Sequence, residues 1–402
     1  MPGADAGPGA ALPQFDARLT MPHRVLVIGG SGSFGGRLVD GLIAHSDFDV
    51  AIAGRDLGRA AAKAEQCGPR ASALSLDTTS VTAEQLAAPD AFVVVDAAGP
   101  FQGADYRLAR AAIAARMHYL DLADARGFVA EFGRLDTVAR AAGVVALTGA
   151  SSTPALSHAV LDRMTAGWRH IDTIEIAISP GNRSAPRGLS VLRAILSYTG
   201  KPVRVFAGAD WVMRPGWGWP VRRDMPGLGQ RWLSLCETPD LDLVPARFAP
   251  QQTAVFRAGL ELPALHFGLS LAGLAVRARL LPSLVPFAGL FRWVGERLGG
   301  MGSDRGGMLV EAAGIDASGE PARAIWSLVA EAGDGPVIPT LPALAAIRAL
   351  ADGSLSRPGA RPCVGELALE AIAREFAPYR ITMQLLVSPT DDAVAIPATA
   401  RC

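Results

Sequence analysis

A glycine-rich turn between two apolar segments constrains the fold of this chain more than any other feature. The apolar run 25–28 stops at a turn that reads Gly30-x-Gly32-x-x-Gly35, and apolar residues at helical spacing follow it. Glycine lets the backbone bend tightly and approach a phosphate group. The next helix then aims its free N–H groups and positive dipole end at that phosphate. The segment therefore predicts a dinucleotide-binding strand, turn and helix, and the alternative is an ordinary tight turn. The residues predicted to bind the cofactor here are Gly29, Gly30, Gly32, Ser33, Phe34 and Gly35.

The next predicted strand, 49–55, ends in an arginine at the place where the adenosine ribose is bound. A carboxylate there would bind the 2′-hydroxyl of NAD, whereas a guanidinium pairs with the 2′-phosphate of NADP. Arg55 therefore favours NADP over NAD, and the alternative is a solvated surface charge. Asp77 ends a third predicted strand, 73–77, and is placed either at the adenine edge or as the cap of the following turn.

Strands and helices alternate through the first 150 residues. The run 92–96 is apolar throughout, as expected of a strand buried on both faces. The turn after it, with Ala98, Gly99 and Pro100, is predicted to meet the nicotinamide half of the cofactor. Predicted helices at 57–64, 105–115 and 129–142 and a predicted strand at 144–147 complete the pattern. This alternation predicts an α/β fold with a Rossmann-type, doubly wound parallel sheet.

The candidate proton donors lie at and just after another predicted strand, and they are His118, Tyr119, Asp121 and Asp124. Tyr119 and Asp121 are predicted to be catalytic, because a phenol or a carboxylate there could exchange the proton when a C=N, C=O or C=C bond is reduced. The alternatives are a packed Tyr119 and a helix-capping Asp121. The hydroxyls of residues 151–153 are expected to cap a helix that contains His158, or else to meet the nicotinamide or the substrate.

The second half predicts another α/β (α+β) domain, built on a mixed sheet. Residues 171–178 alternate like a strand, a helix is expected over 188–198, and two strands pair around the turn 316–319. The aromatic segment 214–220 is predicted either to line a substrate cleft or to pack as a loop. The predicted domains are a disordered tail over 1–20, a cofactor domain over 21–150 completed by about 336–380, a substrate or dimerisation domain over 151–335, and a tail over 387–402.

Residues 262–299 form a long apolar stretch interrupted by Arg277 and Arg279. Neither uncharged half reaches the ~20 apolar residues that a membrane-spanning helix needs. We therefore expect a helical hairpin. Three alternatives remain open for it, namely a buried core element, the surface of a homodimer, and a face lying in the membrane interface.

Composition excludes several functions. The 38 basic and 38 acidic residues balance and no basic stripe stands out, which argues against a nucleic-acid partner. The four cysteines are scattered without metal-ligand spacing, so no metal site is predicted. The first 20 residues lack the pattern of a signal peptide. We therefore expect a cytoplasmic protein, with peripheral contact at the inner face of the membrane as the alternative that depends on 262–299.

Several segments together resemble the saccharopine dehydrogenase-like family of NADP-binding oxidoreductases. They are VLVIGGSGSFGG, AGRD, VVVDAAGPF, HYLDLAD, GASSTPALS, SDRGG and GPVIP, which lie between residue 21 and about residue 376. The resemblance implies a Rossmann domain, a second α/β domain that covers the cofactor cleft, and hydride transfer with NADP(H). It does not imply saccharopine as the substrate, because no arginine cluster for a substrate with several carboxylates can be placed.

The sequence thus predicts an NADP-dependent oxidoreductase that transfers a hydride to or from a C=N or C=C bond. The apolar second half favours a small, hydrophobic or lipid-like substrate. The alternative is a non-catalytic NADP-binding redox sensor or a membrane-associated module.

Overall fold

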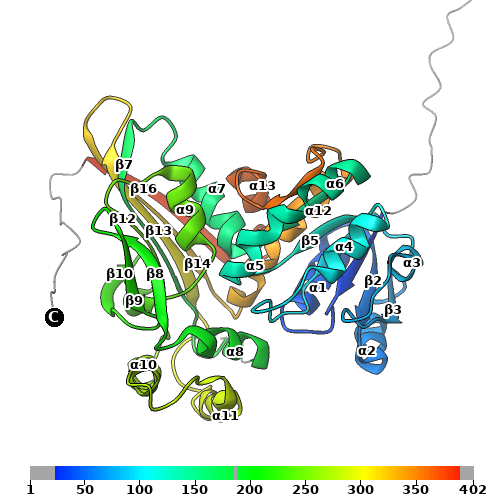
Figure 1. Ribbon diagram of the computed structural model, residues 1–402, viewed down its shortest axis with the longest axis horizontal. Coiled ribbons are helices and arrows are strands. Elements are labelled where there is room, and N and C mark those ends of the chain that lie inside the picture. Colours follow the sequence, from blue (N-terminus) through cyan, green and yellow to red (C-terminus); the bar gives the residue numbers. More distant parts are fainter. Residues whose placement is uncertain (1–22, 185–187, 390–402) are drawn as a thin grey trace, which may run out of the picture.

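The computed structural model describes residues 23–184 and 188–389, which form two sheets with helices packed against them (Figure 1). The first sheet has seven strands and the second has nine. Figure 1 shows the first sheet at the right, with its earliest strands in blue, and the second sheet at the left. The predicted fold class, a doubly wound parallel sheet joined to a domain built on a mixed sheet, is confirmed.

All strands of the first sheet run parallel. In order across the sheet they are β15 (Gly359–Pro362), β6 (Val145–Thr148), β5 (His118–Asp121), β4 (Val93–Asp96), β1 (Arg24–Ile28), β2 (Asp49–Gly54) and β3 (Ala71–Ser75). The chain order reverses between β1 and β4, so their carboxyl ends border the crevice where such sheets bind ligands. The late strand β15 lies within the stretch predicted to complete this domain.

Helices cover both faces of this sheet. Val25 and Val27 of β1 pack toward one hydrophobic layer, and Leu26 and Ile28 pack toward the other, because side chains alternate along a strand. The first layer includes α1 (Gly35–His45), α2 (Leu57–Cys67) and α12 (Leu341–Ala351). The second includes α3 (Ala83–Ala87), α4 (Arg107–Ala114), α5 (Arg126–Glu131), the short 3₁₀ helix Phe132–Leu135 and α6 (Asp136–Ala142).

The second sheet is mixed. Strand β7 (His170–Ser179) pairs in parallel with β12 (Thr253–Ala258) and antiparallel with β13 (Gly306–Ile315). Strands β13 and β14 (Pro321–Ala330) form the predicted pair around the turn 316–319. The remaining strands are β8 (Pro202–Ala207), β9 (Trp211–Pro215), β10 (Val221–Met225), β11 (Gly229–Leu235) and β16 (Ile381–Pro389).

The remaining helices before, between and after the strands of the second sheet complete the described fold. They are α7 (Ser157–Met164), α8 (Leu189–Tyr198), α9 (Asp240–Phe248), α10 (Pro263–Arg277), α11 (Ala288–Arg297) and α13 (Leu369–Arg374). A π-helical turn (Ser152–Leu156) and two 3₁₀ helices (Val285–Phe287 and Gly335–Thr340) join them. None of the helices in the described ranges is both long and apolar enough to cross a bilayer.

Several element boundaries differ from the sequence-based expectation. The predicted helix over 129–142 is divided into α5, a 3₁₀ turn and α6, and β3 ends at Ser75, two residues before Asp77. The predicted tail 387–402 begins inside β16, because Val387 still pairs with Ala324 of β14. The predicted tail 1–20 lies outside the described residues.

Two expectations for individual side chains were resolved by packing. The hydroxyls of residues 151–153 make no side-chain cap on the helix that follows, so the capping prediction was wrong, and Thr153 is buried in the π-helical turn. In the aromatic segment 214–220, Trp217 is 2% exposed and donates from Nε1 to the carbonyl oxygen of His266 at 3.2 Å. That segment is therefore a packed loop that continues from β9.

Candidate functional site

The glycine-rich turn folds tightly between β1 and α1. The Gly32 N–H donates to the Gly29 carbonyl oxygen at 2.8 Å, and Gly29 adopts a positive φ of 73°. A Cβ atom on Gly29 would lie 2.9 Å from the Cα of Ala98, and one on Gly35 would collide with the Gly29 carbonyl oxygen. Phe34 at the N-cap position makes no side-chain cap on α1, and the Gly36 N–H donates to the Gly32 carbonyl oxygen at 2.9 Å, so the turn runs directly into the helix.

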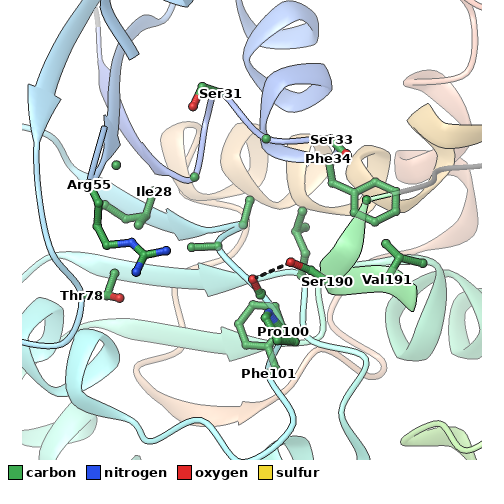
Figure 2. Close-up of a pocket in the computed structure, with 18 of the residues that line it drawn as sticks. Ile28, Ser31, Ser33, Phe34, Arg55, Thr78, Pro100, Phe101, Ser190 and Val191 are labelled. Atoms are coloured by element: carbon green, nitrogen blue, oxygen red, sulfur yellow. Dashed lines mark hydrogen bonds between the residues drawn. The ribbon is translucent and has the colours of Figure 1, made fainter. Parts of the chain in front are cut away.

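A cavity of about 510 Å³ opens beside this turn, at the carboxyl ends of β1, β2 and β4 (Figure 2). Its volume lies within the roughly 300–1,000 Å³ typical of ligand pockets. Two of the predicted cofactor residues, Gly30 and Gly35, lie under the turn and do not line the cavity. The predicted residues that do line it are Gly29, Gly32, Ser33, Phe34, Arg55, Asp77, Ala98, Gly99 and Pro100.

Arginine side chains gather at one side of the cavity. Arg55 follows β2 and points inward near Thr78 in Figure 2. Arg59, one helical turn later, also lines the cavity and donates from Nη2 to the carbonyl oxygen of Ser31 at 3.3 Å. Asp56 caps α2 by accepting from the Arg59 N–H at 3.1 Å, which explains an acidic residue so close to Arg55. This side therefore presents two guanidinium groups and is suited to an extra phosphate.

Asp77 lines the same side and also shapes its own loop. Its Oδ1 accepts from the backbone N–H of Thr79 at 2.9 Å and from the Thr79 hydroxyl at 2.8 Å. These hydrogen bonds lower the pKa of Asp77, so the carboxylate stays ionised. Asp77 therefore caps the following turn, which is one of the two alternatives predicted for it. It also borders the cavity.

Asp124, a candidate proton donor that is not one of the two residues predicted to be catalytic, reaches the cavity. It lines the cavity after β5 and accepts a long hydrogen bond from Nε2 of Gln102, at 3.4 Å. Its side chain is exposed in the cavity, and desolvation by the surrounding protein raises its pKa. Asp124 lies three residues after Asp121 in the segment HYLDLAD. Asp121 is the last residue of β5 and is buried, whereas Asp124 lies in the loop beyond the strand and reaches the cavity.

The two predicted catalytic residues do not line the cavity. Tyr119 is 1% exposed and stacks on Phe132, with ring centroids 5.8 Å apart, and burial raises its pKa well above the ordinary value. Asp121 is fully buried, and its Oδ1 accepts from the backbone N–H groups of Ala123 and Gly149 and from the Thr148 hydroxyl. Burial raises its pKa to about 7. This geometry favours structural roles for both, and their catalytic role stays a prediction.

Helix α8 brings the second domain onto the cavity. Ser190, Val191 and Ala194 line it, and the Ser190 hydroxyl donates to the Gly99 carbonyl oxygen at 3.2 Å (Figure 2). One turn beyond Ala194, the Tyr198 hydroxyl lies 3.1 Å from the Cys236 sulfur. The charge of Asp124 contributes to raising the pKa of both groups, although their own burial is the larger cause. The cavity is therefore built by both domains.

The apolar part of the lining lies away from Arg55. Phe34 and Val191 lie at the side of the pocket opposite Arg55, and Pro100 and Phe101 lie between the two sides (Figure 2). Leu122 adds a further apolar side chain. The arrangement places ionic groups around one portion of a long ligand and apolar side chains with one carboxyl group around another. A dinucleotide with a reactive ring at its second half fits this distribution.

Comparison with known proteins agrees with this geometry. Residues 25–162 match the family described as the saccharopine dehydrogenase NADP binding domain. The chain is similar in structure to the apo, histidine-tagged saccharopine dehydrogenase (L-Glu forming) of Saccharomyces cerevisiae, with 14% sequence identity and a TM-score of 0.64, over 90% of this chain and 100% of that chain. It also matches a probable dehydrogenase from Thermotoga maritima, with 14% identity and a TM-score of 0.42, over 90% of this chain and 98% of that chain. No curated protein matches the chain by sequence.

The domain match covers the glycine-rich turn and the strands that surround the cavity, and the yeast structure shares the fold over nearly the whole chain. The predicted family resemblance is confirmed, and so is a nicotinamide cofactor. Residues 25–162 therefore form an NADP-binding domain of the saccharopine dehydrogenase type, and the chain is similar in fold to a dehydrogenase over nearly its whole length.

Proposed function

We propose that this protein transfers a hydride between NADP(H) and a C=N or C=C bond of a small or hydrophobic substrate. The observation that carries the proposal is the single cavity lining shared by Arg55, the glycine-rich turn and Asp124. It offers a guanidinium for a phosphate at one side and a titratable carboxyl group at another. A bound nicotinamide would supply the hydride, and the chain itself supplies binding, orientation and a proton.

The residues of the first domain fit NADP in three ways. The glycine-rich turn is closed so tightly that no Cβ fits at Gly35, and this holds the backbone of Gly29 and Gly32 at the cavity, where a diphosphate can approach it. The start of α1 directs N–H groups at it. Arg55 and Arg59 are both exposed to the cavity, where a 2′-phosphate can accept hydrogen bonds from either guanidinium.

Asp124 is the group proposed to hold the proton. Desolvation raises its pKa, which brings a carboxyl group closer to the pH at which it can both donate and accept. Gln102 donates to Asp124 Oδ1 and so helps to orient the carboxyl group. Reduction of a C=N or C=C bond requires one proton beside the hydride, and Asp124 can deliver it to the atom that does not receive the hydride.

The preference for a hydrophobic substrate is supported by the apolar side chains that line the cavity together with Asp124. They are Phe34, Phe101, Leu122, Val191 and Ala194. Apolar side chains contribute little to the binding of a substrate with several carboxylates. They stabilise a bound hydrocarbon by about 25 cal/mol for each Å² of apolar surface that binding removes from water. A hydrocarbon portion beside the reacting bond fits this environment best.

The test compares Asp124→Asn with Asp105→Asn. Asp105 lies on the neighbouring connection, between β4 and α4, is exposed and pairs with its local neighbour Arg107, so its variant serves as the control. NADPH consumption is followed with panels of imines and of α,β-unsaturated carbonyl compounds, and NADPH affinity is measured by fluorescence. Asp124→Asn is expected to keep its NADPH affinity and lose about 10²-fold or more in kcat. If NADPH binds but no compound in either panel is reduced, the non-catalytic sensor becomes the better interpretation.

A further inference from the structure

We propose that the segment 262–302, called here the apolar hairpin, docks into the surface of a bilayer that contains anionic lipids. The hairpin consists of α10, the connection 278–287, α11 and the five residues after it. Figure 1 shows α10 and α11 at the lower edge of the second domain, beyond α8. This surface is separate from the cofactor cavity, so the proposal can succeed or fail independently of the proposed reaction.

Helix α10 is apolar on both of its sides. Its inward side, with Leu269, Gly273 and Val276, is buried against the domain. Its outward side presents Phe267 and Leu271, and Leu271 is 69% exposed. A helix that is apolar all round is normally enclosed by protein or by lipid. Since the outward side of α10 is open, residues 23–184 and 188–389 do not supply that enclosure.

The rest of the hairpin continues this surface. Leu280 in the connection is 77% exposed and Trp293 on α11 is 53% exposed, and Phe287, Leu290 and Met301 are exposed as well. Tryptophan is enriched where membrane and water meet, because its ring is apolar and its N–H is polar. With 15 and 10 residues, α10 and α11 are too short to span a bilayer of about 30 Å, so a position in the interface is the arrangement that fits them.

The charge of the hairpin selects the lipid. Residues 262–302 contain four arginines and one glutamate, a net charge of 4 − 1 = +3. Arg277, Arg279, Arg292 and Arg297 are all exposed, and the Arg297 guanidinium lies 5.2 Å from the centre of the Trp293 ring. The glutamate, Glu296, lies 3.5 Å from Arg292, within its own helix. Basic residues beside exposed apolar side chains complement an anionic lipid surface.

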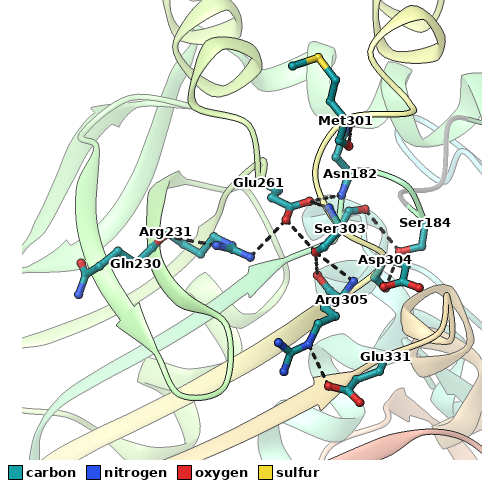
Figure 3. Close-up of polar contacts among 11 residues, drawn as sticks. Asn182, Ser184, Gln230, Arg231, Glu261, Met301, Ser303, Asp304, Arg305 and Glu331 are labelled. Carbon is teal, nitrogen blue, oxygen red and sulfur yellow. Dashed lines mark hydrogen bonds and ion pairs between the residues drawn. The ribbon is translucent and has the colours of Figure 1, made fainter.

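A polar cluster fixes the base of the hairpin to the second sheet (Figure 3). Glu261, just before α10, accepts from the backbone N–H of Asn182 at 2.7 Å and from the Ser303 hydroxyl at 2.7 Å. Asn182 donates from Nδ2 to the carbonyl oxygens of Leu298 and Met301, at 2.6 and 2.9 Å. Both ends of the hairpin are thus held in place. The exposed apolar face belongs to an anchored element and is presented in a fixed direction.

A second copy of the chain complements this surface less well than lipid does. A two-fold interface places the same patch on both subunits, so the four arginines of one hairpin would face the four of the other, with Glu296 as the one acidic side chain of each hairpin. An anionic bilayer pairs each of these arginines with phosphate and accepts the apolar side chains between them. We therefore assign the bilayer, and a hairpin-mediated dimer is an outcome that the test can reveal.

Docking would also place the cavity near the membrane. Leu189, Ile195 and Leu196 of α8 pack with the inward residues of the hairpin, while Ser190, Val191 and Ala194 on the same helix line the cavity. Only α8 therefore separates the two surfaces along this path. If the proposed function holds, a hydrophobic substrate dissolved in the bilayer would reach the cavity over a short distance.

The test is flotation of the full chain with vesicles of phosphatidylcholine alone and with 30% phosphatidylglycerol. The wild type is expected to float with the anionic vesicles and to be released by salt. Leu271→Asp/Leu290→Asp is expected to lose binding at least about tenfold, since each change puts a charge on the apolar face. Arg277→Gln/Arg279→Gln is expected to weaken binding about thirtyfold, at ~1 kcal/mol for each basic residue. The control Val138→Asp alters an exposed apolar residue on α6 and should bind like the wild type.

Thermal melting of each variant separates loss of docking from loss of folding. Binding that survives in Leu271→Asp/Leu290→Asp would overturn the proposal, and so would a wild type that ignores anionic vesicles. A concentration-dependent dimer that Leu271→Asp/Leu290→Asp dissociates, without vesicle binding by the wild type, would assign the surface to a second copy instead.

Discussion

Ser190 of the second domain donates a hydrogen bond from its hydroxyl to the carbonyl oxygen of Gly99 in the first, across 3.2 Å. The bond joins α8 to the turn that follows β4, and both segments line the cavity. Gly188, two residues earlier, also lies against the glycine-rich turn, where a Cβ atom would be 3.2 Å from the Ser33 hydroxyl oxygen. The beginning of α8 therefore touches both loops that are expected to hold the cofactor.

Ser190→Ala is expected to weaken NADPH binding by up to about fivefold, because one neutral hydrogen bond contributes about 1 kcal/mol. Ser197→Ala is the control. Its hydroxyl lies on the same helix but bonds within it, to the carbonyl oxygen of Ala194 at 2.6 Å. Fluorescence titration measures both affinities. Equal affinities for Ser190→Ala and the wild type would show that this bond does not support the closed arrangement.

Arg55→Ala and Arg59→Ala are each expected to weaken NADPH binding about tenfold to a hundredfold, the effect of losing a charged hydrogen bond. NADH, which lacks the 2′-phosphate, should bind each variant nearly as it binds the wild type. Arg110→Ala, at an exposed position on α4, provides the control. A loss of the same size for both nucleotides would remove the assignment of these arginines to the 2′-phosphate.

Gly35→Ala is expected to abolish cofactor binding, because the new methyl group would collide with the Gly29 carbonyl oxygen and force the turn open. Gly36→Ala is the matched control, since the nearest atom to a Cβ there, the Gly30 carbonyl oxygen, is 3.5 Å away. Alanine also favours a helix over glycine by up to about 1 kcal/mol. NADPH titration and thermal melting of the two variants should therefore give opposite results. Normal NADPH affinity in Gly35→Ala would contradict the turn geometry.

The protein should lose stability as the pH rises between about 4 and about 7, through Asp121. Burial raises the pKa of Asp121 in the folded state to about 7, from an ordinary 3.8. Between these values the folded state binds the proton that the unfolded state has released, so stability falls with rising pH and changes no further above the folded-state pKa. Asn does not titrate in this range, so in Asp121→Asn the melting temperature should decline less steeply with rising pH. Asp105→Asn, at an exposed site, should not.

A decline of the same steepness in Asp121→Asn and the wild type would show that Asp121 does not hold its proton in the folded state. Some slope is expected to remain in the variant. Burial raises the pKa of Asp96 to about 6, so this second carboxyl group also lowers the stability of the folded state as the pH rises.

The first domain was predictable because its signals are local. The glycine spacing after β1, the apolar run of β4 and the arginine after β2 each depend on a few neighbouring residues. Local backbone freedom and the alternation of strands with helices are enough to specify a parallel sheet and the edge at which a dinucleotide binds. The mixed second sheet followed from the same kind of pattern in residues 171–178 and around the turn 316–319.

The tertiary structure decided which side chains reach the cavity. Asp121 and Asp124 lie three residues apart in one motif, yet the end of β5 buries the first and the loop after it exposes the second to the cavity. The same holds for α8, whose position over the cavity depends on packing between residues far apart in the chain, and for the apolar hairpin. The amino acids of residues 262–299 identify an apolar hairpin, but whether its outward face is covered depends on the rest of the fold. Periodicity is a property of a segment, whereas exposure is a property of the assembled molecule.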